Sequence, residues 1–90
     1  MKTYMFSIYD KVACVFAKPF VEVNKNSAVR AYETAIKQSP HIADHDLYII
    51  AEYDDNNGKI KPLEVTCIMT GLDVKQQEQA LEMENVSHLL

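Results

Sequence analysis

Two strand-like runs joined by a turn sequence constrain the fold of this 90-residue chain more than any other feature. The segment 47–54 alternates, so its side chains fall on two sides of a strand: Leu47, Ile49, Ala51 and Tyr53 on one, Tyr48, Ile50 and Glu52 on the other. Asp55-Asn56-Asn57-Gly58 is typical of a turn because Asn and Gly tolerate positive φ. The chain returns as a strand over 59–69, where Pro62 indicates an edge or a bulge. The pattern predicts a β-hairpin that pairs 47–54 with 59–66.

The first twenty residues predict a second hairpin. Residues 3–9 alternate weakly, with Tyr4, Phe6 and Ile8 facing one way and Met5, Ser7 and Tyr9 the other. Asp10-Lys11 interrupts the run, and 12–18 resumes it, so 3–9 is expected to pair with 12–18. Pro19 cannot donate to a strand ladder and marks a bend before the short extended stretch 20–23.

Residues 27–38 predict an amphipathic helix. Asn26 is the expected N-cap, because its side chain can accept a hydrogen bond from an early free amide. Ser39-Pro40 ends the helix, since the residue before proline is disfavoured in the helical region. One face carries the apolar side chains of Val29, Tyr32, Ala35 and Ile36.

The elements together predict an α+β fold: a small antiparallel sheet of two hairpins, with the inserted helix packed on one face and a helical segment at the C-terminus. Residues 1–71 are expected to form one domain. Residues 72–90 are expected to form a helical segment that serves in interaction or dimerisation. Its loose apolar stripe consists of Ala80, Met83, Val86 and Leu90.

Composition limits the function classes. The net charge of −4 is divided unevenly, +3 over residues 1–40 and −7 over 41–90, which does not suit a genome-packaging protein but allows one basic surface. Cys14 and Cys67 are far apart and predict two buried free thiols in a reducing compartment. The longest apolar run, 12–17, is too short to span a membrane. Residues 1–3 open straight into strand-like sequence, so no signal peptide is expected.

Catalysis and cofactor binding find no support in the motifs. The serines lack a nucleophile-elbow setting, and two glycines cannot build a phosphate loop. The chain is therefore expected not to be an enzyme and to need no cofactor. His41, Asp44, His45 and Asp46 carry metal-binding side chains, but an exposed polar connection is the favoured interpretation. Residues 53–64 imitate the spacing of a calcium loop, yet Tyr53 stands at the first ligand position, so a hairpin turn is favoured.

Aromatic residues provide the remaining functional signal. Phe6, Phe16, Tyr32 and Tyr53 are assigned to the core. Tyr9 and Tyr48 fall on the sheet face opposite the helix, where an apolar surface must be covered or used. Self-association or the C-terminal segment ranks above stacked DNA bases there. A homodimer is expected to use three side chains of this face: Met5, Tyr48 and Ile50.

Four strings, SIYDKVA, KPF, NSAVRAY and EYDDNNGKI, carry a family resemblance. Through them, residues 5–65 resemble the small nonstructural protein of gokushoviruses, single-stranded DNA phages of the microvirus group. The resemblance implies a nonstructural, DNA-binding protein that helps the switch from duplex replication to single-stranded genome synthesis. It brings no catalytic motif, and the acidic second half of the chain departs from what strong DNA binding requires.

The leading hypothesis is a nonenzymatic phage accessory protein, acting in the host cytoplasm, that binds single-stranded DNA weakly. Its candidate contacts combine basic and aromatic side chains: Tyr9, Lys11, Lys18, Phe20, Lys25, Arg30 and Lys37. One alternative is an interaction module that engages the phage replication initiator or a host factor through the C-terminal segment. Another is an assembly aid that binds capsid precursors.

Overall fold

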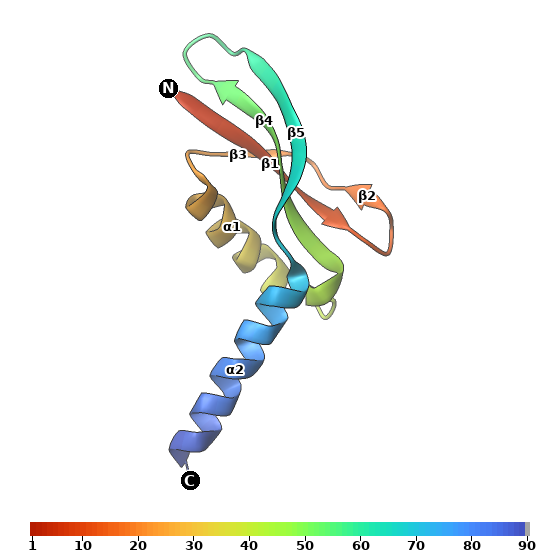
Figure 1. Cartoon of the computed structure of the whole chain (residues 1–90), viewed down its shortest axis with the longest axis vertical. Helices are drawn as coiled ribbons and strands as arrows, with labels where there is room; N and C mark the ends of the chain where they lie inside the picture. The colour runs from red at the N-terminus through yellow and green to blue at the C-terminus, as the bar shows by residue number, and fades with distance from the viewer. Residues whose placement is uncertain (90) are drawn as a thin grey trace.

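The computed structural model describes residues 1–89, with side chains as far as Leu81. Figure 1 shows a curled sheet with one helix against it and a second helix leading away from it. The elements in chain order are β1 (Lys2–Asp10), β2 (Val15–Phe16), β3 (Phe20–Glu22), α1 (Lys25–Lys37), the short 3₁₀ helix η1 (Ile42–Asp44), β4 (His45–Asp54), β5 (Ile60–Met69) and α2 (Gly71–Leu89). The expected α+β architecture is confirmed.

Strand β1 lies at the centre of the antiparallel sheet. It pairs with β4 on one side and with both β2 and β3 on the other, and β5 follows beyond β4. The expected pairing of 3–9 with 12–18 shrinks to two residue pairs, Tyr9 with Phe16 and Asp10 with Val15. The chain then bends at Pro19, which has no amide hydrogen to donate, and pairs again with β1 as β3.

The second hairpin is confirmed, and its pairing continues beyond the expected 59–66 to Met69. Pairing between β4 and β5 runs from Tyr53 with Ile60 to Leu47 with Met69. Two register shifts take up the additional residues of β5. Among the described strands, β5 has only β4 as a neighbour. Lys61 and Pro62 lie on this edge strand, and Lys59 lies just before it. Proline, lysine and bulges all discourage edge-to-edge pairing.

A β-bulge in β4 corrects the expected division of its side chains. Met5 pairs with Ala51 while Phe6 pairs with Ile49, so Ile50 is an additional residue. Because cross-strand partners share a face, the bulge moves Ala51 to the face of Met5, opposite Ile49. Ala51 is accordingly buried but lies outside the main core cluster. The expectation that Leu47, Ile49, Ala51 and Tyr53 share one side is wrong beyond Ile49.

Helix α1 begins two residues before the expected start, and its N-cap is Asn24 rather than Asn26. Asn24 has an extended backbone, and its side-chain oxygen accepts a hydrogen bond from the Ser27 amide at 2.8 Å, which is the geometry of a capping residue. Asn26 lies inside the first turn. The buried positions recur every four residues: Ala28, Tyr32 and Ile36.

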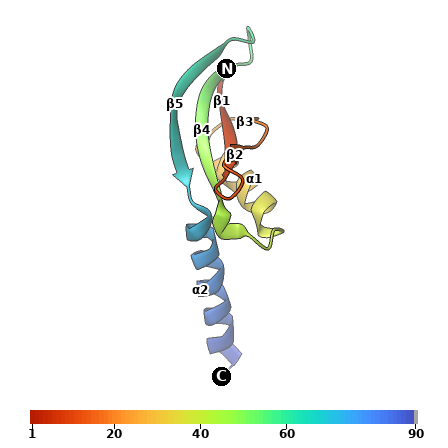
Figure 2. The same cartoon turned by 90° about the vertical axis from the view of Figure 1, so that its right-hand side faces the viewer.

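The core lies between α1 and one face of the sheet. Phe6, Leu47 and Ile49 pack against the buried face of α1 and against Val74 of α2. Val29 is half-buried beside them, whereas Ala35, expected on the buried face, is exposed. Figure 2 shows the sheet nearly edge-on, with α1 on one side of it. The other face of the sheet is not covered by a described helix.

Helix α2 reaches the core through its first turn and also lies against η1. Val74 is 1 % exposed, whereas Leu72, Ala80 and Leu81 are exposed. The radius of gyration is 15.4 Å, above the roughly 12 Å of a compact chain of this length, because α2 leads away from the sheet (Figures 1 and 2). Of the expected apolar stripe, the side chains of Met83 and Val86, and Leu90 as a whole, lie outside the described part. Within that part, no helix has the length and apolar character to cross a membrane.

Both cysteines are free, but the expectation that they are buried is wrong. Cys14 lies in the exposed turn after β1, and Cys67 lies in the edge strand β5. Partial burial raises the pKa of Cys67, which favours the neutral thiol over the reactive thiolate.

Candidate functional site

Three aromatic rings gather on the sheet face opposite α1. Tyr9 is the last residue but one of β1, Phe16 pairs with it from β2, and Tyr48 comes from β4. The ring centroids are 4.6 Å apart for Tyr9 and Phe16, 5.4 Å for Phe16 and Tyr48, and 6.0 Å for Tyr9 and Tyr48. Tyr48 contacts both other rings nearly edge-on, an arrangement that aromatic quadrupoles favour. These three side chains are called the ring cluster below.

The strand pattern explains why the rings face away from α1. Ile8 packs against the core, so its neighbour Tyr9 points to the other side of β1. Tyr48 is the cross-strand partner of Ser7, which lies on the Tyr9 side. None of the three rings belongs to the core cluster. The assignment of Phe16 to the core was therefore wrong: its side chain is 44 % exposed.

The turn that carries β2 is held by Asp10. One carboxylate oxygen of Asp10 accepts hydrogen bonds from the amides of Val12 and Ala13, at 2.9 and 3.1 Å. The bond from Ala13 is the largest cause of a lowered Asp10 pKa. The bond from Val12 and the nearby His45 lower this pKa further. Cys14 completes the turn with φ 57°, a left-handed conformation uncommon outside glycine.

Two further hydrogen bonds fix the far end of β2. The Ala17 amide donates to the Ile8 carbonyl at 2.8 Å, and the Ser7 hydroxyl donates to the Ala17 carbonyl at 2.7 Å. Ser7 is almost fully buried, so this short link cannot move without leaving a buried hydroxyl unpaired. The ring cluster thus rests on a segment that is bonded at both ends.

The phenol of Tyr9 carries no negative charge at neutral pH. The adjacent Cys14 thiol, together with partial desolvation, raises the pKa of Tyr9 above its ordinary value. The phenol therefore stays protonated and offers a neutral ring and a hydroxyl to a ligand.

The seven candidate DNA contacts are divided among three places. Tyr9, Lys11 and Lys18 lie on or beside the β1–β2 segment. Phe20 packs against the core, 5.9 Å from the Phe6 ring centroid. The remaining three lie on or at the start of α1, the helix that covers the other face of the sheet: Lys25, Arg30 and Lys37.

Ion pairing distinguishes the basic residues further. Lys11 lies 3.5 Å from a carboxylate oxygen of Asp46, and Lys37 lies 3.9 Å from Glu33. In the described part of the chain, no ion pair involves Lys18, which is exposed in the link between β2 and β3. The same holds for Lys25 and Arg30 on α1. Lys18 differs from them in its position, because it follows Phe16 by two residues in the chain.

The proposed dimer residues occupy the same side of the sheet only in part. Met5 and Tyr48 lie on the face opposite α1, and Ile50 is the bulge residue, all three half-buried. The homodimer through these residues stays a prediction.

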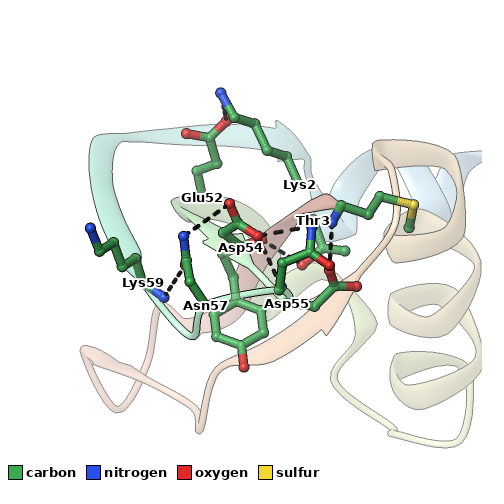
Figure 3. A network of polar contacts seen from close by, with 10 residues as sticks. Lys2, Thr3, Glu52, Asp54, Asp55, Asn57 and Lys59 are labelled. Carbon is green, nitrogen blue, oxygen red and sulfur yellow. Dashed lines mark hydrogen bonds and ion pairs between the residues drawn. The ribbon is translucent and has the colours of Figure 1, made fainter.

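Polar side chains at the tip of the β4–β5 hairpin form a turn-stabilising network (Figure 3). Asp54 accepts hydrogen bonds from the Asn56 amide at 2.9 Å and from the Asn57 side chain at 3.4 Å. Asp55 lies 2.6 Å from the amino group of Met1. Gly58 supplies the positive φ, 74°, that the turn requires. The hairpin turn favoured over a calcium loop is therefore what the structure contains.

In the described residues, no group of three or more His, Cys, Asp or Glu side chains is placed to hold a metal ion. His41 and Asp44 belong to the connection around η1. The His45 ring nitrogen Nδ1 lies 2.9 Å from the His41 carbonyl oxygen, so this histidine serves local structure.

A comparison with protein families shows a match over most of the chain. Residues 3–74 match the model of a family described as Phage ORF5 protein. The matched region runs from β1 to the first turn of α2 and includes the whole ring cluster and Val74. No curated protein and no solved structure matches the chain.

Proposed function

Because this chain belongs to the Phage ORF5 protein family, we propose that it is a nonenzymatic phage accessory protein that binds single-stranded DNA weakly during genome replication. In narrower terms, it is the nonstructural protein of a gokushovirus, acts in the host cytoplasm and assists the switch to single-stranded DNA synthesis. The family match supports the phage origin, and the four sequence strings support the narrower assignment.

The ring cluster is the observation that most supports the proposed DNA binding. Three aromatic side chains lie on a sheet face that no described helix covers, and the exposed Lys18 follows Phe16 by two residues in the chain. Proteins that bind single strands without sequence preference combine aromatic rings for base stacking with cationic groups along the phosphates. Here the rings and the lysine come from one segment, β1 to β3.

Charge explains why the binding is weak. The chain has a net charge of −4, and Asp46 neutralises Lys11 beside the ring cluster. Few phosphates are therefore neutralised, and release of counterions contributes little to affinity. The contribution of stacking is correspondingly larger, which favours unpaired bases over duplex DNA.

A titration of a fluorescent single-stranded oligonucleotide at two salt concentrations tests this function. Replacing Lys18 with Ala should lower the slope of log K against log salt by about 0.7, the value for one phosphate contact on a single strand. Lys61→Ala is the matched control, since Lys61 is an exposed lysine on β5. An oligonucleotide that remains unbound by the wild-type protein at low salt would exclude direct DNA binding.

The second candidate function is a protein-interaction module, favoured by the course of α2. Beyond Val74 this helix leads away from the sheet, and its side chains as far as Leu81 are exposed except for the half-buried Glu78. Its partner would be the replication initiator, a host factor or a capsid precursor. A pull-down from infected cells with and without nuclease separates the two functions, because a protein partner survives nuclease treatment.

A homodimer through Met5, Tyr48 and Ile50 would use the same face as the DNA. Sedimentation with and without an oligonucleotide tests this competition. Twice the monomer mass in the free protein, shifting towards monomer when the oligonucleotide is added, is the expected result. A monomer at all micromolar concentrations would exclude the dimer.

A further inference from the structure

Phe16 is the most exposed ring of the ring cluster. Its side chain is 44 % exposed, whereas Tyr9 and Tyr48 are half-buried at lower exposure. Tyr9 lies against it with a ring centroid distance of 4.6 Å, and Tyr48 meets it edge-on at 5.4 Å. The two tyrosines therefore contact part of the Phe16 ring and leave the rest of its surface in solvent.

The backbone that carries Phe16 is already fixed in the free protein. Asp10 holds the preceding turn through two amides, and Ser7 holds the following link through the Ala17 carbonyl. A side chain that is ordered before binding loses little conformational entropy when a ligand arrives. A preorganised, exposed ring is what a flat ligand needs.

We propose that Phe16 is the stacking residue for one unpaired base of single-stranded DNA, with Tyr9 and Tyr48 as positioning residues and Lys18 as the contact to the neighbouring phosphate. This proposal rests on the proposed function and assigns its central contact. The unpaired charge of Lys18, two residues along the chain, is what selects a polyanion over an uncharged apolar partner. A base in a duplex has both faces covered by its neighbours, so the ligand is a single strand.

Phe16→Ala and Val15→Ala form a matched pair of variants. Val15 is the other residue of β2 and is 55 % exposed, so both changes remove an exposed apolar side chain from the same strand. Loss of one stacked base should raise the Kd for an oligonucleotide about 5- to 150-fold in Phe16→Ala. Val15→Ala should bind like the wild type.

A second experiment compares two ligands on the wild-type protein, so a folding defect of a variant cannot affect it. A strand of the same length that lacks bases keeps the phosphates, so it should bind the wild type more weakly than the normal strand by the same factor. Phe16→Ala should bind the two strands equally. Equal affinity of the wild type for both strands would overturn the stacking role while leaving DNA binding intact, and no binding of either strand would remove both proposals.

Phe16→Trp adds a spectroscopic test. The natural chain has no tryptophan, so this variant carries a single indole at the proposed contact. It should bind the normal strand with wild-type affinity, and its fluorescence should be quenched by the normal strand and not by the strand without bases. Unchanged fluorescence on saturation with the normal strand would place the DNA elsewhere and overturn the proposal.

Discussion

The carboxylate of Asp46 accepts a hydrogen bond from the backbone amide of Gly71 across 2.9 Å. Asp46 is 6 % exposed at the start of β4, and Gly71 is the first residue of α2. The bond satisfies an amide that the helix itself cannot pair, and it places a carboxylate at the positive end of the helix. Three residues later, Val74 enters the core. These two contacts fix the direction in which α2 leaves the sheet.

Asp46→Ala should lower the free energy of unfolding by roughly 1–3 kcal/mol, because it leaves a buried amide without a partner. Asp46→Asn is the control, since its side-chain oxygen can still accept the bond, and it should cost less. Urea denaturation measures both. Equal losses for the two variants would show that the negative charge, and not the hydrogen bond, holds the helix.

Two of the three alanines of helix α1 have opposite environments and test the corrected helix face. Ala28 is fully buried and Ala35 is exposed. Ala28→Leu should destabilise the protein by roughly 1–3 kcal/mol through overpacking, whereas Ala35→Leu should be nearly neutral. Thermal or urea unfolding of the two variants measures both losses of stability. A larger loss for Ala35→Leu than for Ala28→Leu would support the helix face expected from the sequence.

The sequence predicted the elements better than their faces. The alternation of 47–54 and the turn at Asn57-Gly58 identify the β4–β5 hairpin, because both depend on neighbouring residues. The bulge at Ile50 depends on how β1 pairs with β4, residues far apart in the chain, so no local pattern predicts it. Asn24 and Asn26 are equally good caps by residue type, and only the backbone conformation distinguishes them.

The candidate site shows the same limit. Tyr9 and Tyr48 were placed on the correct face by strand alternation alone. Phe16 was missed. A tight turn at Asp10-Lys11 would pair Phe16 with Met5, and cross-strand partners share a face, so the pairing rule would have given its face. It would not have given its partner, because the structure places Phe16 opposite Tyr9 across the longer turn 11–14. Pro19 predicts a bend from its residue type, but not that the bend returns the chain to β1 and packs Phe20 on Phe6.

Tyr32 predicts a loss of stability in alkali. Its hydroxyl donates to the His45 carbonyl at 2.6 Å, and burial is the first cause of a strongly raised pKa. Because the pKa of Tyr32 is raised in the folded state, its protonated hydroxyl contributes fully to stability below the unfolded pKa of 10.0. This contribution is lost as the pH rises from 10.0 towards the folded pKa. Tyr32→Phe should be less stable at pH 8 because the His45 carbonyl loses its donor.

The comparison between pH 8 and pH 10.5 isolates this group. The wild type should lose more stability over that interval than Tyr32→Phe, measured by the urea midpoint. Tyr53→Phe is a control for a tyrosine outside the core cluster. Identical pH dependence of wild type and Tyr32→Phe would mean that other groups dominate the alkaline transition.

Truncation within α2 separates the anchored turn from the rest of the helix. A chain that stops after Gly71 loses Val74, which is 1 % exposed in the core. It should be destabilised by roughly 1.5–3 kcal/mol, the value of one buried aliphatic side chain. A chain that stops after Gln76 keeps this residue and should unfold close to the full-length midpoint. Equal stability of the two truncated chains would support a domain that ends at residue 71.

Asp10 predicts that the turn before Phe16 loosens in acid. The hydrogen bonds from the Ala13 and Val12 amides favour the charged carboxylate and lower its pKa below the ordinary 3.8. Since the pKa of Asp10 is lower in the folded state, its carboxylate contributes fully to stability above the ordinary pKa of 3.8. This contribution is lost as the pH falls through the lower folded pKa. The amide chemical shifts of Val12 and Ala13 should therefore titrate together with a midpoint below 3.8. Asp10→Asn keeps an acceptor oxygen but cannot titrate, so the same amides should stay unchanged over that range. A midpoint at or above the ordinary value in the wild type would mean that the turn is not held by the carboxylate, and the fixed position of Phe16 would lose its support.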